Sequence, residues 1–159
     1  MNWFTSWLKR RGSWRMIQRD GEDYLERYFL LRLFGHDWYL HSFWKSDPDD
    51  VHDHPYDNTS FILKGGYREY FYDGTFKDRG RWSYIFRQAE LAHRIEVAPG
   101  SEGKTWTIFH KGKRRREWGF YTSKGWQAAA EYDREPVDVY GRDFVYKGWL
   151  FPRIVWLNK

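Results

Sequence analysis

The chain has 159 residues, with 27 basic and 22 acidic side chains, and therefore a formal charge of +5. This length suits one domain with a sizeable core, and the absence of cysteine excludes disulfides, thiolate metal sites and a cysteine nucleophile. No apolar stretch approaches the ~20 residues that cross a bilayer, and the N-terminus lacks a signal-peptide pattern, so we expect a cytoplasmic protein without membrane contact.

Aromatic residues make up 22% of the chain, which is the unusual feature of its composition. Aromatic side chains favour strands, where flat rings pack well on a pleated surface. The composition therefore predicts a β-rich fold in which most rings form the core. Some of them could instead stack on a sugar or a base.

A short amphipathic helix is predicted over residues 2–11, ending at Gly12. One face of this helix carries the large apolar side chains Trp3, Phe4, Trp7 and Leu8. Such a face could lie on a membrane surface. At about three turns it is better suited to the body of the protein or to a second copy in a homodimer, and we expect one of these to bury it.

From Ser13 onward the apolar period changes toward two, which predicts strands. The expected strands cover residues 15–19, 24–33, 38–44, 58–63, 67–72, 83–86, 93–97, 105–109 and 115–121. Turn signals about every ten residues are typical of an all-β sandwich or barrel. The last two strands are expected to pair with each other. The tail offers a helical turn over 127–132 and an aromatic segment over 144–156, which Pro152 interrupts.

The metal-binding chemistry is concentrated at His52-Asp53-His54. In a strand, residues two apart point to the same face, so the two imidazoles can bind one metal ion while Asp53 points away. Neutral imidazole is the commonest protein metal ligand near pH 7. An isolated pair of this kind is often incidental, so the surrounding spacing decides its meaning.

The sequence after His54 resembles the first motif of the cupin superfamily, in which two histidines are followed by a glutamate and a glycine. The histidines fit, and so does Gly65 or Gly66, depending on the spacing. Asn58 or Thr59 stands at the glutamate position. The glycine that usually opens the motif is also absent.

The second cupin motif supplies a further histidine one hairpin later, and His93 stands there within the segment 92–95. The likeness covers about residues 39–121 and includes the segments 51–69 and 114–120. It implies an all-β double-stranded β-helix, or jelly-roll barrel, whose mouth holds a metal ion. The expected organisation is an amphipathic helix over residues 1–12 followed by a single cupin barrel domain with a C-terminal extension over residues 13–159.

The resemblance implies that His52, His54 and His93 are three facial metal ligands, leaving positions open for substrate, water or dioxygen. This three-histidine set is similar to that of the thiol dioxygenases among cupins. Nitrogen ligands suit Fe, which we expect, or Ni, Zn or Cu, better than Mg or Ca. The alternatives are a vestigial site in a non-catalytic barrel and three histidines with ordinary structural roles.

Three other polar side chains, His41, Tyr56 and Asn58, are candidates to support the ligands or to move protons. His41 could line the pocket as an acid–base group, or it could be purely structural. An amide is a weak neutral donor, so Asn58 should hydrogen-bond a metal-bound water rather than ligate the metal. His110 is the reserve candidate for third ligand, and His36 is expected in a solvated turn.

Basic residues crowd the segment 111–116, and on a strand Arg116 would share a face with Trp118. Arginine binds carboxylates and phosphates through two parallel hydrogen bonds. Arg116 is therefore the candidate residue for binding an anionic substrate, with Trp118 beside it. The alternative is a permanent ion pair with Glu69 or Asp57. Nucleic acid is not favoured as a partner, because the net charge is modest and no nucleic-acid-binding motif is present.

These patterns predict a metal-dependent cupin enzyme that acts on a small anionic metabolite, with a three-histidine non-haem iron dioxygenase as the leading hypothesis. The metal would hold substrate and dioxygen together inside an aromatic barrel. A metal-assisted isomerase or hydrolase and a non-catalytic binding or sensor module are the alternatives. The shortage of general acids near the motif favours redox chemistry or plain binding over isomerisation.

Overall fold

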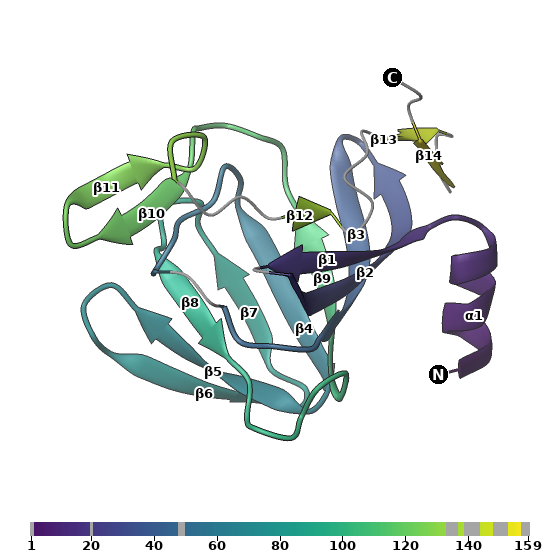
Figure 1. Cartoon of the computed structure of the whole chain (residues 1–159), viewed down its shortest axis with the longest axis horizontal. Coiled ribbons are helices and arrows are strands. Elements are labelled where there is room, and N and C mark those ends of the chain that lie inside the picture. The colour runs from purple at the N-terminus through teal and green to yellow at the C-terminus, as the bar shows by residue number, and fades with distance from the viewer. Residues whose placement is uncertain are drawn as a thin grey trace.

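The computed structural model describes residues 2–19, 21–47, 50–132, 137–138, 144–147 and 153–156, and it is dominated by antiparallel strands (Figure 1). The elements are α1 (Asn2–Arg10), β1 (Trp14–Arg19), β2 (Glu22–Leu33), β3 (His36–Phe43), β4 (Asn58–Lys64), β5 (Gly66–Phe71), β6 (Phe76–Gly80), β7 (Tyr84–Arg87), β8 (His93–Glu96), β9 (Thr105–Lys111), β10 (Gly119–Thr122), β11 (Gly125–Ala128), β12 (Val137–Asp138), β13 (Phe144–Lys147) and β14 (Arg153–Trp156). In the described part of the chain, no helix has the length and apolar character needed to cross a bilayer.

Two sheets enclose the core. The larger has the strand order β12-β1-β2-β3-β9-β4-β7 and the smaller has the order β6-β5-β8. Figure 1 shows β5 and β6 below the strands of the larger sheet and β8 to the left of β7. Both sheets contribute to one buried cluster, which contains Ile17, Tyr24, Leu25, Phe43, Ile62, Tyr67, Ile85, Ile95 and Val97. The all-β jelly-roll expected from the sequence is therefore confirmed.

The register of the larger sheet places polar side chains in a row next to this core. Arg15 pairs with Arg27, Arg27 pairs with His41, and His41 pairs with Thr107. In the adjacent row, Leu25 lies opposite Phe43, and both are buried. Because residues two apart share a face of a strand, the row of Arg15, Arg27 and His41 faces the interior as well.

The expected pairing of residues 105–109 with residues 115–121 is wrong. β9 lies between β3 and β4 and is hydrogen-bonded to both, so it has no free edge. β10 pairs with β11 instead, in a tight approach that requires Gly119, where a Cβ atom would lie 2.0 Å from the Gln127 carbonyl oxygen. The strand β11 also replaces the first part of the helical turn expected over 127–132.

Most of the other strands expected from the sequence are present in the structure. The strands expected over residues 15–19 and 24–33 are confirmed as β1 and β2. The expected strands that correspond to β3, β4, β5, β7 and β8 are also confirmed, within a few residues at their ends. β6 was missed, because its side chains are largely exposed and show no apolar alternation. The aromatic tail forms the hairpin β13–β14, in which Phe144 pairs with Trp156. Pro152 lies outside the described residues.

The helix α1 packs on the larger sheet through only part of its apolar face. Leu8 is 3% exposed and lies in a cluster with Tyr28 and Leu40, and Phe4 packs against the same cluster. Trp3 is 78% exposed, so the expectation of a fully covered face is met by Leu8 and not by Trp3. Burial of a second copy against this face stays a prediction.

We expect Leu8→Ala to lower the free energy of unfolding by about 2–5 kcal/mol, because it leaves a cavity in a packed cluster. Trp3→Ala is the matched control on the same helix and should leave the stability of the isolated chain almost unchanged. Denaturant unfolding followed by tryptophan fluorescence measures both. Equal effects of the two substitutions would contradict this packing of α1.

Candidate metal centre

The segment around His52 lies between β8 and β10 as an extended strap held by backbone hydrogen bonds. The His52 N–H donates to the His93 carbonyl at 3.0 Å, and the His93 N–H donates back at 2.9 Å. On the strap's next residues, the Asp53 N–H donates to Gly119 and the His54 N–H to Ala89. An extended strap puts His52 and His54 on one side and Asp53 on the other.

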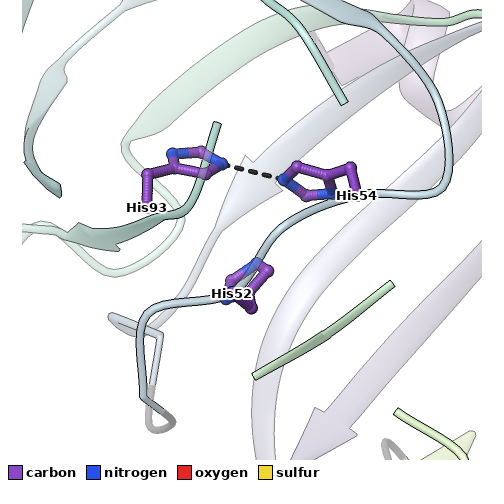
Figure 2. A group of neighbouring side chains, drawn as sticks. All are labelled: His52, His54 and His93. Atoms are coloured by element: carbon purple, nitrogen blue, oxygen red, sulfur yellow. Dashed lines mark hydrogen bonds between the residues drawn. The ribbon is translucent and has the colours of Figure 1, made fainter. Parts of the chain in front are cut away.

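The imidazoles of His52, His54 and His93 converge on one point (Figure 2). Their nearest ring nitrogens all lie within 4.8 Å of one another, and Nε2 of His54 is 2.8 Å from Nε2 of His93. A transition metal bound at about 2.0–2.1 Å from each imidazole holds its ligand nitrogens roughly 3–4 Å apart. The three side chains therefore fit a single ion after small rotations. Within the described residues, this is the one cluster of three or more histidines or carboxylates with such spacing.

The protonation states of these side chains also suit a metal. Burial, assisted by the charges of Arg87 and His52 and opposed by Glu69, lowers the pKa of His93 to about 4. Burial, followed by the charges of His93 and His52, holds the pKa of His54 well below its usual 6.5. Both imidazoles are thus neutral at pH 7, as metal ligation requires.

Glu69 on β5 lies directly behind His93. It is 0% exposed, and its Oε1 is 2.8 Å from Nδ1 of His93, a close contact although bent away from hydrogen-bond geometry. The same carboxylate accepts hydrogen bonds from Arg87 at 2.5 Å and from Arg79 at 2.8 Å. Burial alone would raise the pKa of Glu69, but His93 and Arg87 outweigh it and keep the group ionised. A carboxylate behind a histidine orients the ring and favours Nε2 as the metal ligand.

Asp53, on the far side of the strap, is the ion-pair partner of Arg116. The buried Asp53 carboxylate accepts hydrogen bonds from Arg116 Nη1 at 2.7 Å, from the Gly119 N–H at 2.7 Å and from Trp126 Nε1 at 3.1 Å. Arg116 therefore forms a permanent ion pair and does not line the cavity beside the histidines. This corrects the expectation of a substrate clamp at Arg116, and it also replaces Glu69 and Asp57 as the expected partners.

Arg116 does not line the cavity because of the local backbone conformation. Residues 112–118 do not form a strand, so the alternation that assigned Arg116 and Trp118 to one inner face does not apply. Trp118 nevertheless lies at the site, with its ring edge-on to His52 at a centroid distance of 6.2 Å. Asp57 pairs with Arg115 instead.

A cavity of about 450 Å³ opens beside the three histidines, and all three expected supporting residues line it. Tyr56 stacks on His54 at a centroid distance of 6.1 Å, and burial raises the pKa of Tyr56, so its phenol stays neutral. Asn58 is 1% exposed; its Oδ1 faces Arg87 Nη1 at 3.5 Å, and its Nδ2 has no hydrogen-bond partner among the described residues.

His41 lies in the cavity wall, but its contact differs from that of an acid–base group. Its Nε2 is 3.1 Å from Nε of Arg27. Burial, followed by the charges of Arg27 and Arg15, holds the pKa of His41 well below 6.5. An arginine Nε–H can only donate, so Nε2 of a neutral His41 is the acceptor and the ring proton is on Nδ1.

The two remaining histidines lie away from the cavity. Nδ1 of His36 is 2.9 Å from Nε2 of His110, and the two rings are stacked on each other beside Trp38. His36 is half-buried by this contact rather than solvated. His110 is occupied there, so the role of third ligand falls to His93.

We compared the sequence and the fold of this chain with those of known proteins. No protein family and no curated protein sequence matches the chain. A cupin-2 conserved barrel domain protein from Rhodopseudomonas palustris aligns over 64% of this chain and 69% of its own, with a TM-score of 0.52 and 12% identity. A cupin-2 domain protein from Rhodospirillum rubrum aligns over 71% and 70%, with a TM-score of 0.52 and 10% identity.

A third similar structure is Fe(II) HppE, which aligns over 61% of this chain with a TM-score of 0.49 and 18% identity. The chain spans only 56% of the length of that protein. The two cupin-2 domains and the sheet topology agree on the architecture, and the three histidines stand where the cupin motifs expect them. The chain therefore has the cupin fold, with a three-histidine group that fits a transition metal.

Proposed function

We propose that the protein is a metal-dependent cupin enzyme acting on a small anionic molecule, with an iron centre that uses dioxygen. The observation that carries this proposal is the convergence of His52, His54 and His93 at the edge of a cavity of about 450 Å³. Cavities of about 300–1,000 Å³ are typical of small-molecule sites. Three neutral ligands leave the full charge of the cation in place, which favours an anionic ligand beside it.

An iron ion held by the three histidines would supply neighbouring positions for substrate and dioxygen. The surrounding residues would do the rest. Tyr56 can donate a hydrogen bond or a proton from its neutral phenol, and Asn58 can orient a ligand oxygen with its free Nδ2. The ring of Trp118 walls the site beside His52 and helps to exclude water.

The shortage of acid–base groups supports redox chemistry over proton-transfer isomerisation. Among the described residues that line the cavity, Asp47 is the single carboxylate. It is engaged on both oxygens, by the Tyr24 hydroxyl and by the Ile95 N–H. It is therefore poorly placed to act as a general base on a ligand.

The test is anaerobic reconstitution with Fe(II), followed by exposure to nitric oxide and by oxygen-uptake measurements with a panel of small carboxylates, thiols and phosphonates. We expect about one iron per chain, an electron paramagnetic resonance signal from nitric oxide bound to iron, and oxygen uptake stimulated by at least one acid. His54→Ala treated in the same way is the control. Iron and nitric oxide binding without any stimulated uptake would favour the non-catalytic binding module.

A further inference from the structure

The interior face of β1, β2 and β3 places basic side chains in the wall of the cavity. Arg15, Arg27 and His41 follow one another across these strands, and all three line the cavity that reaches the three histidines. Figure 1 shows the three strands side by side. Arg27 is half-buried in this row and requires an explanation, because a charge withdrawn from water is costly unless something compensates it.

Most arginines near the site are compensated by carboxylates. Arg79 and Arg87 bind Glu69, Arg115 binds Asp57, and Arg116 binds Asp53. In each of these pairs a carboxylate of the protein itself compensates the arginine charge. Arg27 is different, because within the described part of the chain it forms no ion pair with a carboxylate.

The contacts of Arg27 are to neutral groups. Its Nε donates to Nε2 of His41 at 3.1 Å, and its guanidinium carbon lies 5.1 Å from the centre of the Tyr39 ring. Because His41 takes only the Nε–H, the Nη1 and Nη2 N–H groups form the remaining edge. That edge matches the two oxygens of a carboxylate or phosphate.

The described part of the cavity wall offers Arg27 no free carboxylate. Arg15 lies next to Arg27 in the row, and the one described carboxylate of the cavity wall, Asp47, is engaged by Tyr24 and by the Ile95 N–H. His41 is neutral and adds no compensating charge. Asp37, further along β3, is bound by Arg32 and Lys111.

Tyr56 connects the arginine row with the metal centre. Its ring stacks on His54, and it lines the same cavity as Arg15 and Arg27. A ligand in this cavity can therefore contact the histidine cluster at one end and the arginine row at the other. The volume of about 450 Å³ suits a small molecule rather than a macromolecule.

We propose that Arg27, held in place by His41, binds the oxyanion group of the ligand, and that the ligand is a small acid with a second donor group directed at the three histidines. The histidine end of this inference rests on the proposed function, and the Arg27 end does not. The anionic group is a carboxylate or a phosphate. Arg27 is thus a specificity residue, and His41 is a positioning residue.

The experiment titrates metal-free and metal-loaded protein with succinate and with inorganic phosphate, using calorimetry and the intrinsic fluorescence of the tryptophans. We expect at least one anion to bind, and Arg27→Met to weaken it about 10- to 100-fold while metal content and thermal midpoint stay unchanged. Arg27→Lys should recover part of the affinity and guards against a folding defect. Arg68→Met, at an exposed ion pair with Asp78, is the control. The stronger of the two anions identifies the head group.

His41 has a test of its own positioning role. His41→Gln keeps an acceptor for Arg27 and should retain most of the anion affinity, whereas His41→Leu should lose it with metal content unchanged. Equal losses in both variants would contradict the positioning role.

The two proposals fail separately. Wild-type anion affinity in Arg27→Met, or no anion binding by a protein that takes up metal normally, overturns the inference at Arg27 and leaves the metal centre intact. Anion binding that depends on Arg27 in a protein that takes up no metal supports the inference and overturns the proposed function.

Discussion

Replacing Glu69 by glutamine should destabilise the protein by about 3–5 kcal/mol, because it leaves a buried arginine without its counter-ion. Arg87 is 1% exposed, and Glu69 is the acid that it binds. The amide that replaces the carboxylate carries no charge, and it cannot accept hydrogen bonds with both of its terminal atoms. Breaking one side of a buried ion pair costs more than the pair itself contributes, since the remaining charge has no water to solvate it.

The same substitution should act on the metal centre. Losing the carboxylate behind His93 removes the contact that orients its ring, and changes of this kind typically lower metal affinity about 10- to 100-fold. Thermal unfolding of metal-free protein measures the first effect, and metal titration at a temperature where the variant is folded measures the second. The control is Asp78→Asn on the neighbouring strand β6, which loosens an exposed ion pair with Arg68 and should hardly move the unfolding midpoint. A Glu69→Gln protein as stable as this control would show that the buried network does not hold the two sheets together.

Short-range patterns in the sequence were sufficient for much of the fold and for the common direction of His52 and His54. Alternating apolar residues identified the strands from Trp14 to Phe43, because each strand has one face in the core. The spacing of His52 and His54 specified their common direction without knowledge of the strands around them. His93 followed from the resemblance to the second cupin motif, and the structure brings it to the same point.

The residues that contact the histidine ligands from behind could not be predicted in the same way. Glu69, Arg87 and His93 come from three strands, and no local pattern shows which of the 22 acidic residues will lie behind a ligand. That contact depends on how β5 lies against β8 and β7. This arrangement belongs to the tertiary structure and is not visible in the local sequence. Tyr67 belongs to the same network, since its hydroxyl accepts a hydrogen bond from Arg87 at 2.9 Å.

The arginines show how an assumed secondary structure misleads. Arg116 was selected by strand alternation in a segment that is not a strand, and its partner Asp53 lies on the far side of the strap. Arg27 carried a usable signal instead. It stands two residues from the buried Leu25 and two from the buried Phe29, so a charged side chain interrupts an otherwise apolar inner face of β2.

Removing any one of the three histidines should abolish stoichiometric metal binding, which is the largest effect expected on function. Wild-type protein dialysed against Fe(II), Ni(II), Zn(II) or Co(II) should retain about one equivalent of at least one of these metals. His52→Ala, His54→Ala and His93→Ala should each retain little, because two imidazoles without a third ligand hold an ion far less tightly. Elemental analysis by mass spectrometry gives the content, and the visible absorption of Co(II) reports the geometry.

Two controls separate the site from general effects of losing a side chain. His110→Ala removes an imidazole that contacts His36 outside the cavity, so its metal content should equal that of wild type. Asn58→Ala removes a side chain from the cavity wall at the position where the cupin motif has its glutamate, and it should keep the metal because an amide is a weak ligand. If Asn58→Ala lost the metal as completely as His54→Ala, the centre would have four protein ligands. Unchanged metal content in all three of the ligand variants would place the metal elsewhere and refute the three-histidine centre.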